Sequence, residues 1–352
     1  MAQKGSTDSA RGAHDPSALG GSSPSEWRLV WRRFRRDRVA FVALLTLCAV
    51  VAACFVAEPA LEVLLGHDGS QPIPAAVDVN LNPAGPFTRV AYTAPDGSAH
   101  QALLLLGADG PLGRDELLRL LAGGRVSLEI AFIASAIALF LGVILGAIAG
   151  YFGGVADAIV SRLTELLMSF PLLLLMIALG QTVAARFENV TLHGLLQPGV
   201  AGLGLIVGIF CWFYPARLVR ALVASLKEQE FVEAARMIGA SDARIIRQHL
   251  APHVTGPLIV WGTLVASGVI ILEASLSVLN FGVRLGTASW GNLLASNWGT
   301  LLVFDPGAAD GGIYPKPPLL MVWPALILFV TVLSLALAGD GLRSALSPKE
   351  GV

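Results

Sequence analysis

The sequence has little charge. Asp, Glu, Lys and Arg make up 14% of its 352 residues, where a soluble domain carries about 25%. The 24 basic and 25 acidic residues nearly cancel, so no overall positive field would attract a nucleic acid. With 55% hydrophobic residues, this composition excludes a disordered chain and disfavours a soluble enzyme or a nucleic-acid-binding protein. It is typical of a membrane protein with several spans.

Cysteine and lysine are also scarce. The three cysteines lie in apolar runs without a CxxC pair, which predicts buried thiols and no disulfide framework. A phosphate-binding loop needs a lysine directly after glycine, and none of the four lysines follows one. We therefore expect no enzyme activity, no metal and no cofactor in this chain. Any nucleotide hydrolysis would have to come from another polypeptide.

Long hydrophobic runs dominate the rest of the sequence. A membrane-spanning helix needs about 20 apolar residues, and backbone groups in lipid must bond within their own segment. The sequence therefore predicts an all-α membrane protein with six transmembrane helices. We expect the spans at Val39–Ala57, Ile130–Ala156, Thr164–Val183, Val200–Ala216, Val254–Leu272 and Pro317–Gly339.

The basic residues predict the orientation of these spans. Residues 27–38 read WRLVWRRFRRDR and hold six arginines. If both termini are cytoplasmic, 17 of the 24 Lys and Arg lie on that side of the membrane, as the excess of positive charge inside requires. We therefore expect a multi-pass protein of the cytoplasmic (inner) membrane with both termini in the cytoplasm.

The spans divide the chain into five parts. Residues 1–26 are rich in Ser, Gly and Ala and are expected to be a disordered cytoplasmic tail. The basic segment and first span occupy 27–58, an outside loop 59–126, a five-helix core 127–346 and a short tail 347–352. In the loop, Phe87–Tyr92 and Ala99–Leu106 flank Pro95-Asp96-Gly97, which predicts a β-hairpin.

Two further outside segments are expected. Arg114–Leu121 has the amphipathic pattern of a short helix on the membrane surface. Residues 277–316 form a second outside loop with few charges. Acids near the span ends, Glu129, Glu165 and Glu273, are expected to make structural pairs, for instance with Arg125 or Arg162.

The cytoplasmic loop 221–253 between the fourth and fifth spans is strongly patterned. Phe231–Ile238 reads as a helix, and Gly239 after it suits a left-handed helix end. Ser241 would cap a second helix, which would stop before Pro252. Isoleucines and Leu250 on this charged hairpin need a partner, either the bundle or another protein. His249 and His253 have no third ligand nearby, so a metal site is not expected.

One stretch of this loop resembles a known signature. "EAARMIGASDARIIRQHLAP" (Glu233–Pro252) is similar to the EAA motif of permease subunits of ABC importers, in which it forms helices that couple to the ATPase. The resemblance implies the type I ABC importer permease fold. It also implies ATPase-coupling roles for Glu233, Ala234, Ala235, Gly239, Ser241, Ile246, Leu250 and Pro252.

Other segments carry the resemblance further. "GRDELLRLLAGGRVSL" (113–128), "GAIAGYFGG" (146–154), "EASLSVLNFGV" (273–283) and "GDGLRSALSP" (339–348) resemble the second permease of the dipeptide, oligopeptide and nickel branch. The branch usually reads Gly-Thr-Asp-x-x-Gly-Arg-Asp, whereas Asp109 and Gly113 here are one residue further apart. Residues 295–318 also look longer than the corresponding loop of the branch.

The resemblance implies an ATP-driven importer of di- or oligopeptides. Its partners would be a homologous permease, two ATPase subunits, an extracytoplasmic solute-binding protein, the peptide and the lipid bilayer. A permease for nickel or another small solute is the alternative within the branch. An ATP-independent secondary carrier is the alternative outside it, although the spans have no acid at mid-membrane.

Overall fold

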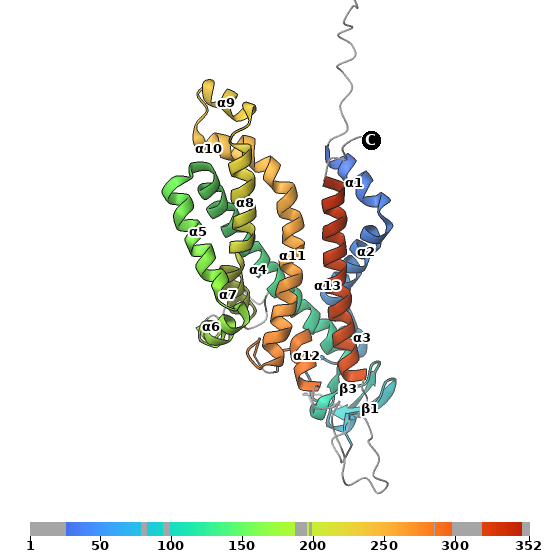
Figure 1. Cartoon of the computed structure of the whole chain (residues 1–352). Helices are drawn as coiled ribbons and strands as arrows, with labels where there is room; N and C mark the ends of the chain where they lie inside the picture. Colours follow the sequence, from blue (N-terminus) through green and yellow to red (C-terminus); the bar gives the residue numbers. More distant parts are fainter. Residues whose placement is uncertain are drawn as a thin grey trace, which may run out of the picture.

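The computed structural model describes residues 26–78, 83–93, 99–186, 196, 199–284, 286–297 and 319–346. The molecule is a long helical bundle (Figure 1). Two short helices, α9 (Glu230–Met237) and α10 (Asp242–Arg244), lie at one end, and the strands lie at the other. We call these ends the hairpin end and the sheet end.

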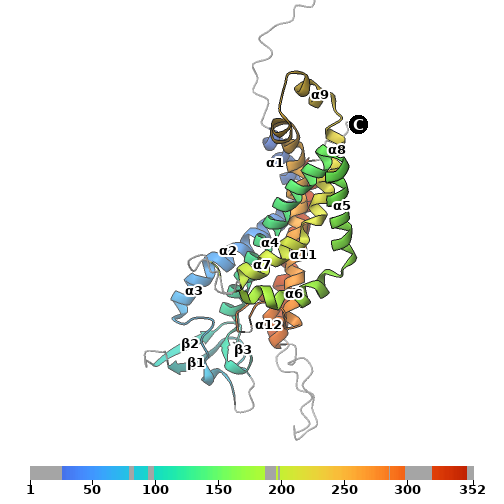
Figure 2. The same ribbon diagram turned by 90° about the vertical axis from the view of Figure 1, so that its left-hand side faces the viewer.

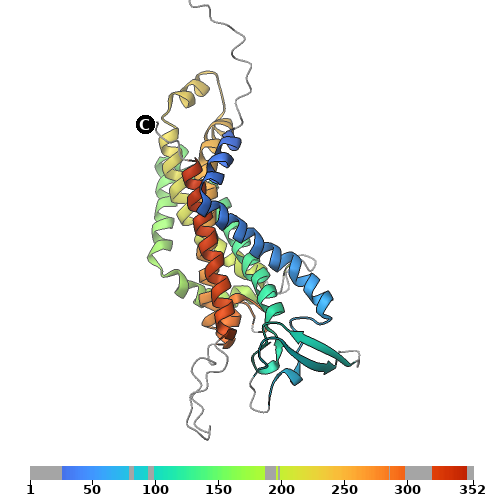
Figure 3. The same ribbon diagram turned by 90° about the vertical axis from the view of Figure 1, so that its right-hand side faces the viewer.

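The N-terminal helices run from the hairpin end toward the sheet end. They are α1 (Glu26–Arg36), α2 (Arg38–Ala52), a π-helical turn (Ala53–Ala57) and α3 (Glu58–Leu65). Asp37 caps α2, because its Oδ1 accepts the backbone N–H groups of Val39 (3.0 Å) and Ala40 (3.1 Å). Phe34 and Ala40 pack on Ala345 of the last helix, which α1 and α2 cross in Figure 3.

Among the described residues, the sheet end contains four short strands. β1 (Thr88–Thr93) pairs antiparallel with β2 (Ala99–Leu104), with Thr88 opposite Leu104; the expected turn at Pro95–Gly97 lies outside the described residues. β3 (Ala108–Asp109) pairs with β4 (Arg114–Asp115). Two 3₁₀ turns, Pro74–Ala76 and Gly110–Leu112, complete this region. Figure 2 shows α3 and these strands leaving the bundle on the side opposite α5.

The expected surface helix at Arg114–Leu121 is wrong. Arg114 and Asp115 belong to β4, and the following residues open α4, one continuous helix over Glu116–Phe152. The side chain of Asp115 caps this helix by accepting the N–H of Leu118 at 3.1 Å. The charged side of the segment is also buried, since Arg119 is 3% exposed. A tertiary ion pair with Asp109 therefore overrides the amphipathic pattern.

The third and fourth hydrophobic segments are bent. α5 (Gly154–Ser169) and α6 (Leu172–Arg186) meet at 85°, so Thr164–Val183 is not one continuous helix as the sequence suggested. Pro171 forces the extended conformation of Phe170 that separates them. α7 (Val200–Cys211) and α8 (Phe213–Leu226) meet at 42°, because Pro215 cannot bond the carbonyl of Cys211.

The remaining helices follow α8 in the chain. They are α9 (Glu230–Met237), α10 (Asp242–Arg244), a π-helical turn (Ile245–Leu250), α11 (Ala251–Val278), α12 (Trp290–Asn297) and α13 (Leu319–Leu346). The sequence suggested that the second helix of the loop stops before Pro252, but the helix continues through this residue. Pro252 lies in the first turn of α11, where a missing N–H is tolerated, and the N–H of Ala251 bonds the carbonyl of Ile246.

Four helices of the described chain are long and apolar enough to cross a membrane. They are Arg38–Leu65, Glu116–Phe152, Asp242–Val278 and Leu320–Leu346, and the number rises to six if each bent pair is one span. The protein is therefore an integral membrane protein built mainly of helices. Of the tails expected at 1–26 and 347–352, residues 1–25 and 347–352 lie outside the described residues, as do residues 285 and 298–316 of the second outside loop expected at 277–316.

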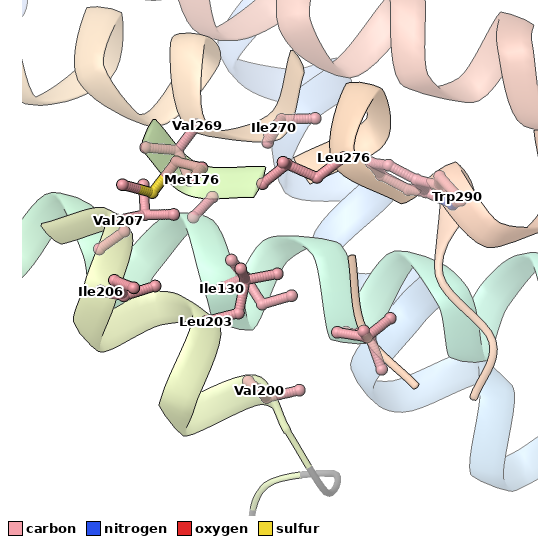
Figure 4. Close-up of a cluster of buried hydrophobic side chains, with 14 of the residues drawn as sticks. Ile130, Met176, Val200, Leu203, Ile206, Val207, Val269, Ile270, Leu276 and Trp290 are labelled. Atoms are coloured by element: carbon pink, nitrogen blue, oxygen red, sulfur yellow. The ribbon is translucent and has the colours of Figure 1, made fainter. Parts of the chain in front are cut away.

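The core lies where α4 meets α6, α7, α11 and α12. Figure 4 shows Ile130 of α4 between Leu203 of α7 and Ile270 of α11, with Met176 and Trp290 beside them. Farther along, α4 touches α8 through Gly142, Gly146 and Gly150. A Cβ at Gly146 would stand 2.5 Å from the carbonyl oxygen of Ala216. Glycine therefore sets the distance between these two helices.

Acidic side chains of the helices make polar contacts, some within one helix and others between helices. Glu129 pairs with Arg125 (3.0 Å) and Glu165 with Arg162 (2.8 Å), which confirms the pairing expected for both acids. Glu273 of α11 behaves differently: it is 1% exposed and accepts hydrogen bonds from Ser127 of α4 (2.9 Å) and Ser277 (2.8 Å). The Oγ of Ser127 accepts the N–H of Trp290, so one buried carboxyl links α4, α11 and α12.

We predict that Glu273→Ala destabilises the folded protein by about 2 kcal/mol, because two buried hydroxyls lose their acceptor. Glu273→Gln should cost less, since an amide oxygen still accepts a hydrogen bond. Unfolding in detergent micelles measures both. Ser275→Ala on the exposed side of the same helix is the control. Wild-type stability of Glu273→Ala would contradict this role.

Candidate functional site

A helical hairpin forms the tip of the hairpin end. α9 and α10 lie beyond the ends of α8 and α11, on the same end of the molecule as α1 and the last turns of α13 (Figure 1). The sequence analysis predicted both helices and the turn between them. α9 begins and ends one residue earlier than expected, whereas the second helix is α-helical only over Asp242–Arg244 and continues as a π-helical turn through Leu250 into α11.

The turn between α9 and α10 depends on Gly239. Its φ of +81° lies in the left-handed region, as the sequence predicted. The N–H of Gly239 bonds the carbonyl of Arg236 (2.9 Å), and that of Ala240 bonds the carbonyl of Ala235 (3.0 Å). This pair of bonds is a Schellman motif, which satisfies the last carbonyls of α9. Ser241 precedes α10 in extended conformation, but its backbone carbonyl, not its side chain, accepts the bonds there.

The inner side of the hairpin packs on the bundle. A single cluster joins Val232 and Ala235 of α9 and Ile245 and Leu250 of the π-helical turn to side chains of α4, α8 and α11: Tyr151, Val219, Val223 and Val254. Ala235 and Leu250 are therefore internal contacts, although the sequence analysis placed them in a coupling surface. Ile246 is half-buried against the same cluster.

The outer side carries the remaining predicted residues. Glu233, Ala234, Gly239, Ser241 and Pro252 are all exposed. The sequence analysis left Met237 out, and it assigned Ile238 only a need for some partner. They are the most exposed large apolar residues of the hairpin, at 87% and 85%. Their position directly before the left-handed glycine could have predicted this exposure, because the reversal of the chain turns them away from the buried cluster.

Tyr151 of α4 ties the hairpin to the bundle, a role that the sequence did not indicate. Its Oη donates a hydrogen bond to Oδ1 of Asp242 at 2.6 Å. The guanidinium of Arg236 lies over its ring, 5.6 Å from the centroid, and the hydrogen bond with Tyr151 raises the pKa of Arg236. The rings of Phe231 and His253 also pack together, 5.5 Å apart. The hairpin is therefore held at a fixed angle rather than hinged freely.

A second feature is an apolar cavity of 470 Å³ inside the bundle region. α6 contributes Leu172 and Leu173 to its wall, and Tyr214 stacks on Trp261 with ring centroids 6.5 Å apart. The rest of the wall is mostly small or apolar: Cys211, Leu264, Val265, Gly268, Val269, Ile271, Leu272 and Ser275. Such a surface accepts varied apolar groups without fixing their orientation.

We predict that Tyr151→Phe loosens the hairpin while leaving the bundle folded. The lost hydrogen bond to the Asp242 carboxylate should speed amide exchange across 230–250 by about fivefold, measured by hydrogen–deuterium exchange. Tyr92→Phe removes a comparable hydroxyl, which donates to the carbonyl of Gly66 at the sheet end, and should leave 230–250 unchanged. Equal exchange of 230–250 in wild type and Tyr151→Phe would disprove the tether.

Comparison with known proteins identifies the family. The model of the binding-protein-dependent transport system inner membrane component matches residues 142–351, which include the hairpin and the apolar cavity. A second model, the N-terminal TM domain of oligopeptide transport permease C, matches residues 25–83.

Curated relatives cover nearly the whole chain. The oligopeptide transport system permease protein OppC of Escherichia coli (strain K12) is 33% identical over 93% of this chain and 92% of its own. The glutathione transport system permease protein GsiD of E. coli O6:K15:H31 is 35% identical over 92% and 90%. The dipeptide transport system permease protein DppC of Lactococcus lactis subsp. cremoris is 29% identical over 97% and 95%. The chain thus belongs to the family of binding-protein-dependent transport system inner membrane components.

Proposed function

We propose that this chain is a permease subunit of an ATP-driven ABC importer that carries peptides. What carries the proposal is its likeness to dipeptide, oligopeptide and glutathione permeases over at least nine-tenths of both chains. The partners would be a homologous permease, two ATPase subunits that bind ATP and Mg²⁺, and an extracytoplasmic binding protein. The hydrolysis would then take place outside this chain.

The hairpin is proposed as the contact with an ATPase subunit. Its exposed residues, among them Glu233, Ala234 and Gly239, stand around the apolar tip of Met237 and Ile238. Two large apolar side chains at an exposed turn gain free energy when a partner covers them. Tyr151 and the buried cluster would pass a push on this tip to α4, α8 and α11, because a rigid lever moves the helices it is packed on.

The apolar cavity is proposed as this chain's share of the peptide path. Its lining comes from α6, the α7–α8 bend and α11, and the partner permease would close it. Tyr214 supports this proposal. No described residue makes a hydrogen bond with its hydroxyl, and such a hydroxyl costs free energy if it faces lipid, whereas it can bond water or peptide in a path. Selectivity for sequence would then rest mainly with the binding protein.

The proposed topology has six spans, each bent pair counting as one. It places the hairpin end and both termini in the cytoplasm, and the β1–β2 hairpin outside the inner membrane. The six arginines at 28–38 and the basic residues of the hairpin then share one side, in agreement with the excess of positive charge inside.

A nickel permease of the same branch is the second candidate and would share this topology, since nickel would be selected by a different binding protein. An ATP-independent carrier would share it as well. Copurification of an ATPase with this chain separates the carrier from both importers. Uptake of labelled peptide against labelled nickel separates the two importers.

We predict that Gly239→Val abolishes transport. A β-branched residue at φ +81° costs about 1–3 kcal/mol of strain, so the hairpin would dock poorly while the spans remain inserted. Peptide uptake should fall by more than about tenfold, and ATP hydrolysis of the reconstituted complex should no longer respond to the loaded binding protein.

Gly239→Asn is the matched control, because asparagine tolerates the left-handed conformation. It should retain most uptake at equal membrane levels. If Gly239→Val transports like wild type, the coupling role of the hairpin is wrong.

We predict opposite accessibility for the two ends of the molecule. In a background without Cys48, Cys54 and Cys211, a membrane-impermeant thiol reagent should label Ser98→Cys in intact cells. Ser241→Cys should react only after the cells are opened. Labelling of Ser241→Cys from outside would overturn the orientation.

A further inference from the structure

A second cavity, of 730 Å³, lies near the sheet end and shares no lining residue with the apolar one. It is enclosed by α3, the first turns of α4 and the segment before α12. Its walls carry opposite charges. Glu58, Glu62 and Asp68 come from α3 and the turn that follows, whereas Arg119 and Arg125 come from α4 and Arg284 from the segment before α12.

The acidic wall contains a carboxyl group without a direct partner. Glu58 is 8% exposed, and no hydrogen bond or ion pair joins its carboxyl to another described residue; Arg125 acts on it only through space. Glu62 accepts the N–H of Gly69 at 3.4 Å, and Asp68 accepts both the N–H and the Oγ–H of Ser70. The carboxyl oxygens of Glu58 are open to the cavity, so a donor that enters the cavity can reach them.

The basic wall contains a nitrogen donor that lacks a hydrogen-bond partner. Arg119 is 3% exposed, and its Nε pairs with Asp109 at 2.5 Å. Its Nη1 is buried without a hydrogen-bond partner in the described chain. Asp109 is already shared with Arg114 (3.3 Å) and Asn297 (3.2 Å), so it cannot also satisfy this nitrogen well. The Arg119 side chain also lines the cavity, where its guanidinium group is suited to a carboxylate.

We propose that this cavity binds a short peptide with free termini, its ammonium group at Glu58 and its carboxylate at Arg119. The choice of a peptide rests on the proposed function. The volume of 730 Å³ lies within the range of sites for small ligands, about 300–1,000 Å³. Among transported solutes, a zwitterionic peptide supplies both missing partners at once, since it brings donors to the acidic wall and acceptors to the basic one.

The proposed site divides recognition between two cavities. The charged termini, which all linear peptides share, would be held near the sheet end. The side chains, which differ between peptides, would meet the apolar cavity of Trp261 and Tyr214 at a later step of transport. A peptide delivered by the binding protein would then bind this permease itself before it moves along the path.

The test uses the complex purified with its partner subunits in nanodiscs, without binding protein and without ATP. The probes are radiolabelled trialanine, N-acetyl-trialanine and trialanine amide, followed by equilibrium dialysis. Trialanine should bind saturably, and each blocked peptide should bind about tenfold more weakly, as expected for one lost charged hydrogen bond. No saturable binding of trialanine overturns the proposal.

Glu58→Gln tests whether Glu58 binds the ammonium group of the peptide. An Arg119 variant is avoided, because it would break the ion pair between Arg119 and Asp109. The Glu58→Gln variant should bind trialanine about tenfold more weakly, yet bind N-acetyl-trialanine as wild type does, because that probe lacks the group Glu58 holds. Glu165→Gln, at an exposed pair on α5, should match wild type with all three probes. Equal losses for both peptides in Glu58→Gln overturn the assignment.

Two further readouts separate the proposal from its rivals. A zwitterionic lipid headgroup is the other occupant to exclude: if phosphatidylethanolamine in the nanodiscs abolishes trialanine binding in wild type, the cavity is a lipid site and the proposal fails. Peptide uptake by cells lacking this chain tests the proposed function alone. Undiminished uptake there would reject that function, whereas dependent uptake with unchanged binding in Glu58→Gln would reject only the peptide site.

Discussion

The close contact of α4 with α8 governs the rest of the structure. Gly142, Gly146 and Gly150 let the two backbones touch, and that contact positions the bend at Pro215 and the bundle around it. Because α4 is continuous from Glu116 to Phe152, it also connects the two ends of the molecule. Asp115 caps it at the sheet end, and Tyr151 binds the hairpin from its last turn. A displacement of the hairpin therefore acts on a helix that also forms part of the charged cavity.

Local backbone chemistry was predictable from the sequence, whereas long-range pairing was not. Gly239 was identified because few residues adopt a left-handed helix end, and Schellman bonds there need only neighbouring residues. The same local reasoning failed at Pro252, since a π-helical turn before a proline leaves no pattern in the sequence. It also failed at Arg114–Leu121, where a buried ion pair with Asp109 turned an apparently amphipathic segment into the start of a core helix.

The candidate site shows the same division. Sequence reasoning placed the hairpin correctly but could not tell its inner side from its outer side, because both carry alanine and isoleucine. Only the packing of α9 on Val219 and Val223 shows that Ala235 points inward and that Ile238 is exposed. The role of Tyr151 could not be predicted for another reason: its hydrogen-bond partner Asp242 lies 91 residues away in the chain.

Glu273 and Glu58 show why buried acids in this chain must be interpreted individually. Each is nearly enclosed, but Glu273 is surrounded by serine hydroxyls from two helices, so its hydrogen bonds are complete and its role is to hold α4, α11 and α12 together. Glu58 faces a cavity across from Arg119 and has no direct partner among the described residues. The difference is not in burial but in whether the protein itself supplies the donors. Where it does, the acid stabilises the fold; where it does not, as at Glu58, the cavity leaves room for a donor from outside the chain.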